Sequence, residues 1–588
     1  MRGLVAVVSV GICSAVIWLV NSAGRIELHT NQIPVQINQH SQELSSSADR
    51  VNAWLRRRWQ AEQLALPQPA SDLTILRRLS LALHGTIPSL EEIRAFESDD
   101  QPQRMERWVD KLLRDNRYAN YFSERLARSL VGVEGGPFIV FRRDQLTDWL
   151  GRHLQADTPW PDLSRQMIAA EGLWTDRPQT NFITVARIED EGLDVNKLAG
   201  RTVRTFLGQR IDCAQCHDHP FDERWSQSDF EGLAAWFASA RLTLGGVTDS
   251  PPADSEPLVY RIPEPGQPEE EGRIVEPVVP FHEEWLPDEG SPRERLAAWV
   301  TDPGNRRFER AIANRIWGLM FGKPWHDPVD DLPHPSDEHA DGSAIDADLL
   351  DVLGQEFRKN GGTIGNLIRI IALSDAFRAS SASNSDSPAA YDHEVEQWAV
   401  FPLIRLRPEQ VIGSLFQANS VSTVDQNSHV FIRLIRFANE NDFIKEYGDL
   451  GDDELLQQVG TIPQSLLRMN GRFTREFTKA DGFSSAAQVI RFSKDDQAII
   501  ENCFLTCLTR RPTEEEAAYF VEKSGLNLAE LPESGSRDSN DKDNRQDEPA
   551  DRESIDRQDE SQRTQQRHET IGDLFWILFN SPEFSWNH

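Results

Sequence analysis

Two cysteines and two histidines stand within seven residues of this chain, in the stretch RIDCAQCHDHPFDERW, residues 210–225. Cys213, Cys216 and His217 have the C-x-x-C-H spacing, in which two thiols can form thioethers with a haem while the adjacent imidazole binds the iron. The same three residues with His219 form a ligand set that suits zinc or non-haem iron. The thiols could also form a short disulfide or serve as structural thiols. Covalent haem, a bare metal and a thiol pair are therefore the three chemistries to distinguish.

A haem at this position raises the question of a second axial ligand. No methionine lies between Met167 and Met320, and His282 is the only histidine between His219 and His326. The iron would therefore be five-coordinate, or it would take His282, Met167 or Met320 as its other ligand.

Two predicted helices brace the cluster. Asp194 is placed to cap a helix that runs through residues 198–207 into the motif, and Ser228 with Glu231 is placed to begin the helix that leaves it. Three aromatic residues are candidates for apolar cover: Trp225, Phe230 and Trp236. The cluster should lie in a loop between two helices.

Helical signals dominate the rest of the chain. Apolar residues recur every three to four positions, as in Leu76, Leu79 and Leu83, while sustained period-two alternation is rare. Helix starts with a Ser or Thr cap and a Glu three residues later occur at three places: Ser89 with Glu92, Ser291 with Glu294, and Thr513 with Glu516. We predict a mainly α fold of two helical domains joined by an irregular Pro/acidic segment, with few short strands.

Composition along the chain suggests the following division. The predicted segments are a signal peptide or membrane anchor (1–25), a lead-in helix and linker (26–69), a first helical domain (70–241), an irregular linker (242–290) and a second helical domain (291–588). The linker is rich in Pro and acidic residues, with a small hairpin expected near LVYRI. Residues 531–569 have almost no apolar side chain, so we expect a disordered acidic insertion there.

The first residues and the overall charge limit the location and the partners. Residues 4–20 form an uncharged run behind Arg2, which indicates export to the periplasm or cell envelope, with a single N-terminal membrane anchor as the alternative to cleavage. A net charge of −32 argues against a nucleic-acid partner, because such binding needs clustered cations.

Two further groups of polar or sulfur-containing residues have spacings that could serve chemistry. The segment HDPVDDLPHPSDEHADG, residues 326–342, crowds His326, His334 and His339 with several Asp residues, and it could bind a divalent cation or form a solvated loop. Cys503 and Cys507 lie four residues apart in an apolar run, which is typical of two thiols on the buried face of a helix.

The residues around the cluster resemble a known family. The stretches LRRLSLALHGTIPSLEEIRAF, VDKLLRDNRYANYFSERLARSL and RTVRTFLGQRIDCAQCHDHPFDERWSQSDFEGLAAWF are similar to the planctomycete cytochrome-like domain of unknown function. A partner domain of unknown function usually follows that family on the same chain. This partner domain is similar to four further stretches: FERAIANRIWGLMFGKPWHDPVDDL, LLDVLGQEFRKNGGTIGNLIRIIALSDAFRASS, RLRPEQVIGSLF and DLFWILFNSPEFSWNH. Where relatives of the partner domain carry Ser-His-Pro-Glu-Leu-Leu, this chain has AIDADLLDVL, so any role of that histidine is absent here.

The resemblance implies an exported protein with a helical two-domain body. With Cys213, Cys216 and His217 as haem c attachment residues, we expect an electron-transfer or redox role beside an unidentified redox partner or enzyme of the envelope. The alternatives are an enzyme or binding module that holds Zn or Fe through Cys213, Cys216, His217 and His219, and a structural surface protein whose cluster staples two helices. With a haem attached, the protein is expected to be a carrier more than a catalyst.

Overall fold

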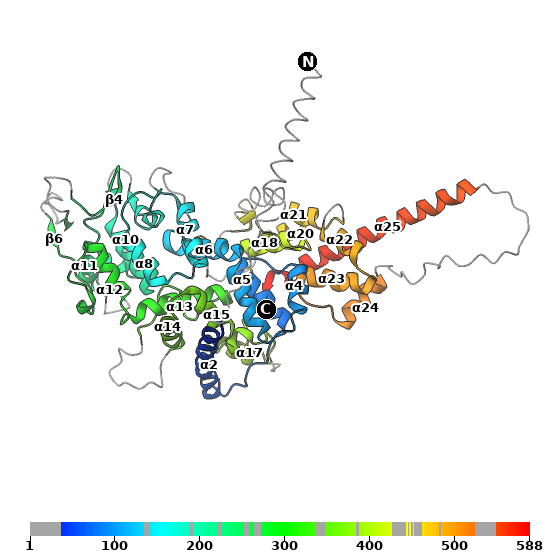
Figure 1. The fold of residues 1–588 in the computed structure, drawn as a ribbon, viewed down its shortest axis with the longest axis horizontal. Coiled ribbons are helices and arrows are strands. Elements are labelled where there is room, and N and C mark those ends of the chain that lie inside the picture. Colours follow the sequence, from blue (N-terminus) through cyan, green and yellow to red (C-terminus); the bar gives the residue numbers. More distant parts are fainter. Residues whose placement is uncertain are drawn as a thin grey trace, which may run out of the picture. The chain divides into compact units, whose positions relative to one another are not determined.

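Helices dominate the structure, a computed structural model, and short strand pairs accompany them (Figure 1). It describes residues 37–133, 141–188, 192–220, 225–251, 258–263, 272–335, 348–383, 387–425, 443–444, 446–448, 451, 455, 461–480, 484–523 and 549–588, with only the backbone at 37–41, 523 and 549–563. The helices of the first half are α2 (Ile37–Ala61), α3 (Asp72–His84), α4 (Leu90–Glu97), α5 (Arg104–Arg114), α6 (Asn116–Val131), α7 (Arg143–Gln155), α8 (Trp160–Ile168), α9 (Asn181–Thr184), α10 (Val195–Thr202) and α11 (Gln227–Ala235). Those of the second half are α12 (Pro292–Val300), α13 (Arg306–Phe321), α14 (Leu349–Lys359), α15 (Ile364–Ala372), α16 (Asp375–Arg378), α17 (Pro388–Glu396), α18 (Pro408–Ala418), α20 (Ile462–Asn470), α21 (Arg472–Phe477), α22 (Ser485–Phe492), α23 (Asp496–Leu508), α24 (Glu514–Lys523) and α25 (Pro549–Asn580). The predicted mainly α fold is confirmed.

Antiparallel pairs of two or three residues a strand make up the sheets of the described residues. The pairs are β1 (Arg187–Ile188) with β2 (Gly192–Leu193), β3 (Arg241–Thr243) with β4 (Gly246–Thr248), β5 (Tyr260–Ile262) with β6 (Arg273–Val275), and β7 (Ile404–Arg405) with β8 (Trp586–Asn587). The hairpin expected near LVYRI is β5 with β6, in which Tyr260 lies opposite Val275.

Helix starts follow the capping residues that the sequence indicates. The Ser89 hydroxyl accepts a hydrogen bond from the Glu92 amide, and the Glu92 carboxylate accepts one from the Ser89 amide. The same reciprocal bonds occur between Ser291 and Glu294. Each pair satisfies amide groups that the first turn of a helix leaves without a partner. Thr513 and Glu516 make the third such pair.

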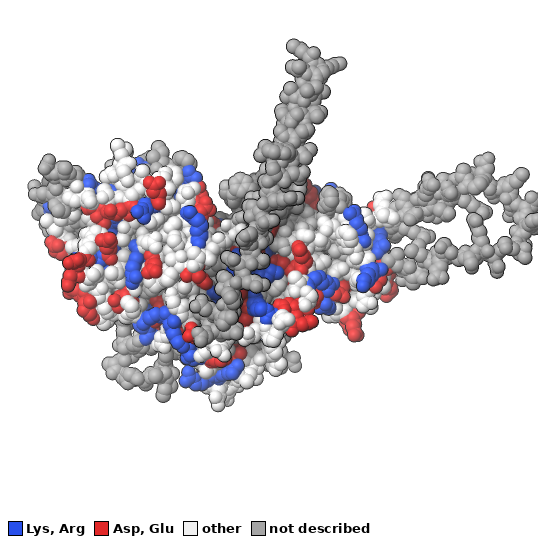
Figure 2. Space-filling view, in the orientation of Figure 1, with Lys and Arg blue, Asp and Glu red and all other residues white. Residues whose placement is uncertain are grey.

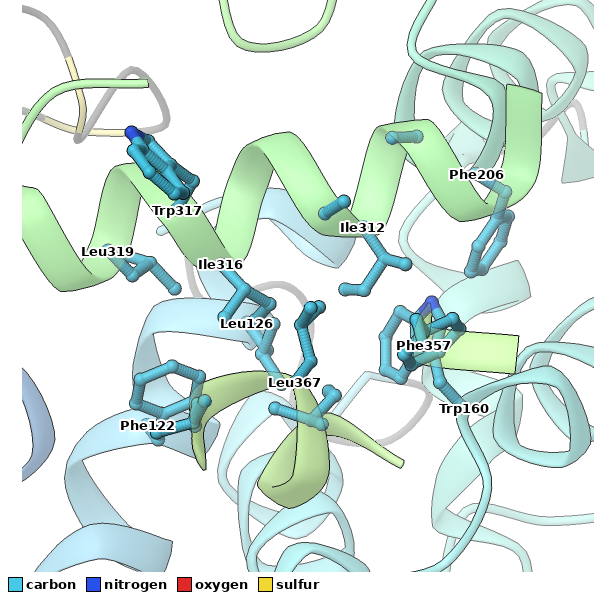
Figure 3. Close-up of a cluster of buried hydrophobic side chains, with 14 of the residues drawn as sticks. Phe122, Leu126, Trp160, Phe206, Ile312, Ile316, Trp317, Leu319, Phe357 and Leu367 are labelled. Carbon is cyan, nitrogen blue, oxygen red and sulfur yellow. The ribbon is translucent and has the colours of Figure 1, made fainter. Parts of the chain in front are cut away.

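The first core is the cluster of buried apolar residues that runs from Leu44 to Phe401 and adds Leu455 and Leu505. Helix α13 is its centre, because every side chain from Arg307 to Phe321 is buried. A helix that is buried all round belongs inside a core rather than on a surface. Figure 3 shows its side chains, Ile312 and Ile316 among them, facing Phe122 and Leu126 from α6, Phe357 from α14 and Leu367 from α15. Residues on both sides of the irregular 242–290 segment therefore build this core.

The second core is the cluster that runs from Leu406 to Phe584 and adds Leu81 and Ile87. Leu81 belongs to α3, whose other apolar residues, such as Leu79, lie in the first core. Helix α3 thus packs into both cores.

Helix α25 differs from the expectation of disorder over 531–569, because it already begins at Pro549 (Figure 1). Residues 531–548 lie outside the described residues. The composition of 549–569 predicts that these residues bury little apolar surface, but Glu, Gln and Arg are good helix formers. The helix is anchored by its end, where Ile571, Phe575 and Phe579 are buried in the second core. A helix already formed there can extend through charged residues at little cost, because propagation is easier than nucleation.

Within the part of the chain that the structure describes, no helix has the length and apolarity needed to cross a membrane. The predicted signal peptide or anchor, with its run at residues 4–20, falls outside the described residues.

Candidate functional site

The Cys/His cluster stands at the end of a helix that changes its winding. Asp194 caps α10 as predicted, by accepting a hydrogen bond from the Lys197 amide. Helix α10 continues into a π-helical turn, Val203–Leu207, which ends at Gly208 with φ of 65°. Such turns are rare and frequently mark functional sites, and a positive φ is adopted most easily by glycine. The chain then enters a 3-10 turn, Asp212–Gln215, that carries the first cysteine.

The two thiols and the imidazole of the C-x-x-C-H motif face outward from this turn. Cys213, Cys216 and His217 are exposed, whereas Ala214 between them is fully buried in the first core. Both cysteines are free thiols, so the disulfide alternative is not what this structure contains. The turn is fixed by the buried alanine and presents its reactive atoms to the outside.

The His217 ring has one nitrogen engaged and one open. Its Nδ1 lies 2.7 Å from the Asp218 carbonyl oxygen. Because a carbonyl oxygen can only accept, Nδ1 carries the hydrogen and donates a hydrogen bond to it. Nε2 has no partner among the described residues, and its lone pair is free. An imidazole held through Nδ1–H by a backbone carbonyl is the usual arrangement of a metal-binding histidine.

His219 and the residues after it are arranged differently from a compact metal site. The His219 amide donates to the Trp225 carbonyl, and the Asp218 carboxylate accepts from the Gln227 amide, so residues 218 and 219 are bonded to residues 225 and 227. Among the described residues, the group of three or more potential ligands whose donor atoms converge within 4.8 Å lies elsewhere, at His84, Glu92 and Asp115. The alternative set of Cys213, Cys216, His217 and His219 is therefore not assembled in this structure.

A loop far along the chain clamps the segment before the cysteines. The Leu332 amide donates to the Gly208 carbonyl at 2.8 Å, and the Gln209 side chain donates to the Leu332 carbonyl. The Arg210 guanidinium binds the Asp330 carboxylate at 2.7 Å. The Gln209 amide oxygen also accepts from the Trp225 indole at 2.9 Å. Residues 208–210 are thus held on both sides, which sets the direction in which the turn emerges.

The helix after the cluster begins two residues earlier than expected. Ser226 with Asp229 forms the capping box of α11, not Ser228 with Glu231. Asp at the third helical position accepts a hydrogen bond from the amide of the capping residue, as Glu does. The expected pattern has Glu or Gln at that position, so it did not include Asp. The aromatic residues predicted as cover are buried in the first core, where the Trp225 ring contacts Phe281. They support the turn from inside.

The three candidate axial residues lie in different surroundings. Met167 and Met320 are fully buried in the first core, so their sulfur atoms cannot reach an exposed turn without unpacking it. His282 is exposed, directly follows the Phe281 that contacts Trp225, and has its Nδ1 2.7 Å from Glu284. Of the three, His282 is the one on the surface.

The histidines of the 326–342 loop bind separate partners. His326 Nε2 contacts the Asp348 carboxylate, and His334 contacts Arg307. Burial raises the pKa of Asp348, but the hydrogen bond from His326 and nearby positive charges outweigh it and hold that pKa below its ordinary value. His339 lies outside the described residues. The described part of this loop contains ion pairs and no convergent metal site.

Cys503 and Cys507 match the expectation of buried helical thiols. Both are fully buried on α23 in the second core. Burial raises the pKa of each thiol, which keeps the nucleophilic thiolate scarce. These thiols are packing groups, in contrast to the exposed pair at 213 and 216.

Sequence reasoning missed a cavity beside the cluster. Its volume is about 220 Å³, and Arg210 and Asp212, the residues just before Cys213, are among those that line it. A signal was present in the spacing of Lys197, Arg201 and Arg204, which places three cations on one helix face. The other walls come from residues distant in the sequence, such as Arg128 and Arg315, and no local pattern joins them to the motif.

Two family comparisons match consecutive parts of the chain. Residues 50–242 match the family described as a protein of unknown function, DUF1549 (PSCyt2), and residues 292–433 match the one described as a protein of unknown function, DUF1553 (PSD1). The chain carries two domains of unknown function, in this order. The predicted order of two domains of unknown function is confirmed, and the clamp on residues 208–210 joins the part that matches DUF1549 to a loop of the part that matches DUF1553. No curated protein and no solved structure matches the chain.

Proposed function

We propose that Cys213, Cys216 and His217 attach a haem c, and that the protein is exported and serves a redox or electron-transfer role in the cell envelope. One observation carries the proposal: two exposed free thiols at C-x-x-C-H spacing stand next to an imidazole whose Nδ1–H is bonded to a carbonyl and whose Nε2 is open. A haem bound there supplies one-electron chemistry.

The surroundings of the motif support the same assignment. Exposure leaves both sulfur atoms accessible for thioether formation, which needs access to the thiol. The Asp218 carbonyl selects the tautomer that binds a metal through Nε2. Clamping by Leu332 and Asp330 limits movement of the segment that carries these groups. Of the three candidate residues, His282 would be the one to hold the iron from its other side, because Met167 and Met320 are buried.

The test is whether a haem stays covalently attached to the protein after extraction. The full chain, matured in a host with cytochrome c assembly machinery, should keep its haem after acid and organic extraction, with a mass increased by one haem and a Soret band. The Cys213→Ala, Cys216→Ala double variant should lose this haem, because no thioether can form. His217→Ala should keep covalent haem but change the iron spectrum. The matched control, Cys503→Ala with Cys507→Ala, should retain the haem.

The result also separates the other assignments. A colourless wild type that holds one zinc or iron, lost in the Cys213/Cys216 double variant, would replace haem by a bare metal. A wild type with neither would make the cluster a structural staple. The envelope location is tested by fractionation, since a full-length chain that remains in the cytosol contradicts both export and haem attachment after export.

A further inference from the structure

The loop that follows α13 is fixed on that helix before it reaches the Cys/His turn. Asn314, fully buried on α13, donates from its side-chain amide to the His326 and Val329 carbonyls at 2.9 and 3.2 Å. Its amide oxygen accepts from the His326 backbone amide at 3.0 Å. Residues 326–332, termed the clasp loop, are therefore attached to the central helix of the first core, within the part of the chain that matches DUF1553.

The clasp loop meets the part that matches DUF1549 at Gly208, where the two segments are in close contact. The Leu332 amide donates to the Gly208 carbonyl at 2.8 Å. A Cβ on Gly208 would lie only 2.8 Å from a methyl carbon of Leu332 and 3.2 Å from the Cβ of Ala311. With its φ of 65°, this position favours glycine for two separate reasons. Movement of the clasp loop is thus transmitted directly to the segment that leads to Cys213.

One carboxylate of the clasp loop, that of Asp330, binds arginines on both sides of Gly208. It lies 2.8 Å from the guanidinium of Arg204, which belongs to the π-helical turn. It also accepts a hydrogen bond of 2.7 Å from the guanidinium of Arg210, three residues before Cys213. Asp330 therefore joins the end of the helix to the beginning of the Cys/His turn.

The Asp330 contacts differ from the ion pairs of the surface. On the face shown in Figure 2, acidic and basic side chains are interspersed over the described surface. An exposed pair such as Arg472 with Glu476, whose side chains are 70% and 47% exposed, contributes little to stability, because water and salt screen it. The Asp330 side chain is only 10% exposed. Removing one partner of a buried pair has a larger effect, because the other charge stays in a poorly solvated place.

Gln209 connects the clasp loop to the other end of the Cys/His segment. Its side chain donates to the Leu332 carbonyl and accepts from the Trp225 indole at 2.9 Å. The Trp225 carbonyl accepts in turn from the His219 amide at 2.9 Å. A continuous series of hydrogen bonds thus runs from the clasp loop to a residue two positions after His217.

We propose that Asp330 is a positioning residue for the C-x-x-C-H turn, and that through it the part matching DUF1553 sets the orientation of the two thiols and the imidazole. Asp330 acts through Arg204 and Arg210, whose positions fix the segment on either side of Gly208. The consequence for a bound haem rests on the proposed function, because groups behind a metal ligand orient that ligand and tune the metal. The effect on the turn itself does not depend on haem.

The first experiment uses the full chain produced without cytochrome c assembly machinery, so that no haem is attached. It compares Asp330→Asn with Asp331→Asn, a matched control at an exposed position of the same loop. Backbone amides of residues 208–217 should exchange with solvent at least about tenfold faster in Asp330→Asn than in the wild type, because the neutral side chain binds both arginines less strongly. The control should exchange like the wild type. Equal exchange in the two variants overturns the proposal.

Arg210→Gln is the second variant, since its side chain is 36% exposed and its replacement leaves Asp330 paired with Arg204. It should accelerate exchange of the same residues, which keeps the proposal testable even if Asp330→Asn does not fold. Exchange of 208–217 in Arg210→Gln at the wild-type rate also overturns the proposal.

The second experiment uses chains matured with haem. Asp330→Asn should keep its haem after extraction but shift the iron spectrum, because the imidazole is held less firmly, whereas Asp331→Asn should match the wild type. An unchanged spectrum in Asp330→Asn contradicts the positioning of the imidazole. A wild type that attaches no haem contradicts the proposed function alone, since exchange in the haem-free chain still decides the role of Asp330.

Discussion

His84 shows how one buried residue couples stability to pH in this protein. Its Nε2 donates to the Leu112 carbonyl at 3.0 Å, and its Nδ1 has no hydrogen-bond partner. The carboxylates of Glu92 and Asp115 lie nearby, but both bind the Arg117 guanidinium. Arg117 therefore already supplies a positive charge to both carboxylates. Burial, assisted by the positive charge of Arg117, lowers the pKa of His84 to about 4.

The first residue-scale prediction follows from that lowered pKa. The unfolded chain binds a proton at His84 near pH 6.5, whereas the folded chain does so only near pH 4. The neutral histidine thus contributes its full stability above pH 6.5, and that contribution falls as the pH decreases from 6.5 to 4, by on the order of 3 kcal/mol. His84→Gln, which keeps a donor for Leu112, should flatten this dependence. Urea unfolding of both chains between pH 4 and 7 measures it, and parallel curves would contradict the assignment.

At the scale of elements, local signals were the most predictable part of the fold. Ser89 and Ser291 cap their helices as the sequence indicates, because a capping box depends on residues three positions apart. The turn at Cys213 and its preceding helix were predictable for the same reason. The walls of the cavity were not, since Arg315 reaches it through the packing of α13. The charged first part of α25 was not predicted, because composition indicates only how much apolar surface a segment can bury. It does not show that a helix anchored at one end can extend through charged residues.

Helix α25 leads to an element-scale prediction about local opening. Its residues 564–569 are mostly exposed, although Arg567 pairs with Asp496 at 3.4 Å, while residues 571–579 supply five buried side chains to the second core. Backbone amides of 571–579 should exchange with solvent at least about tenfold more slowly than those of 564–569, because only the former need the core to open. Hydrogen exchange followed by mass spectrometry distinguishes the two parts. Uniform protection along the helix would mean that its charged part is docked as firmly as its end.

At the scale of the whole molecule, the two cores are connected through α3 of the DUF1549 domain. Arg77 donates to the Cys507, Glu583 and Phe584 carbonyls of the second core. Arg78 donates to the Phe377 and Ala379 carbonyls beside the first core. Burial lowers the pKa of Arg77 to about 10 and of Arg78 to about 9, so both remain charged at neutral pH. These bonds join α3 to segments far along the chain, and no local sequence pattern reveals them.

The first core also crosses the irregular 242–290 segment, which gives the last prediction. Arg293 of α12 is fully buried and donates to the Ile168 and Ala170 carbonyls at the end of α8, so the parts on either side of the segment share hydrogen bonds as well as apolar packing. A specific protease site inserted between β5 and β6 should therefore be cut without dissociation. The two fragments should elute together in native gel filtration and separate only in denaturant, because splitting them would expose the buried faces of α12, α13 and α14. Uncut chain carrying the insertion is the matched control. Fragments that separate in native buffer would show that each part folds around a core of its own, and would assign the contacts of α13 to a weaker interface between independent domains.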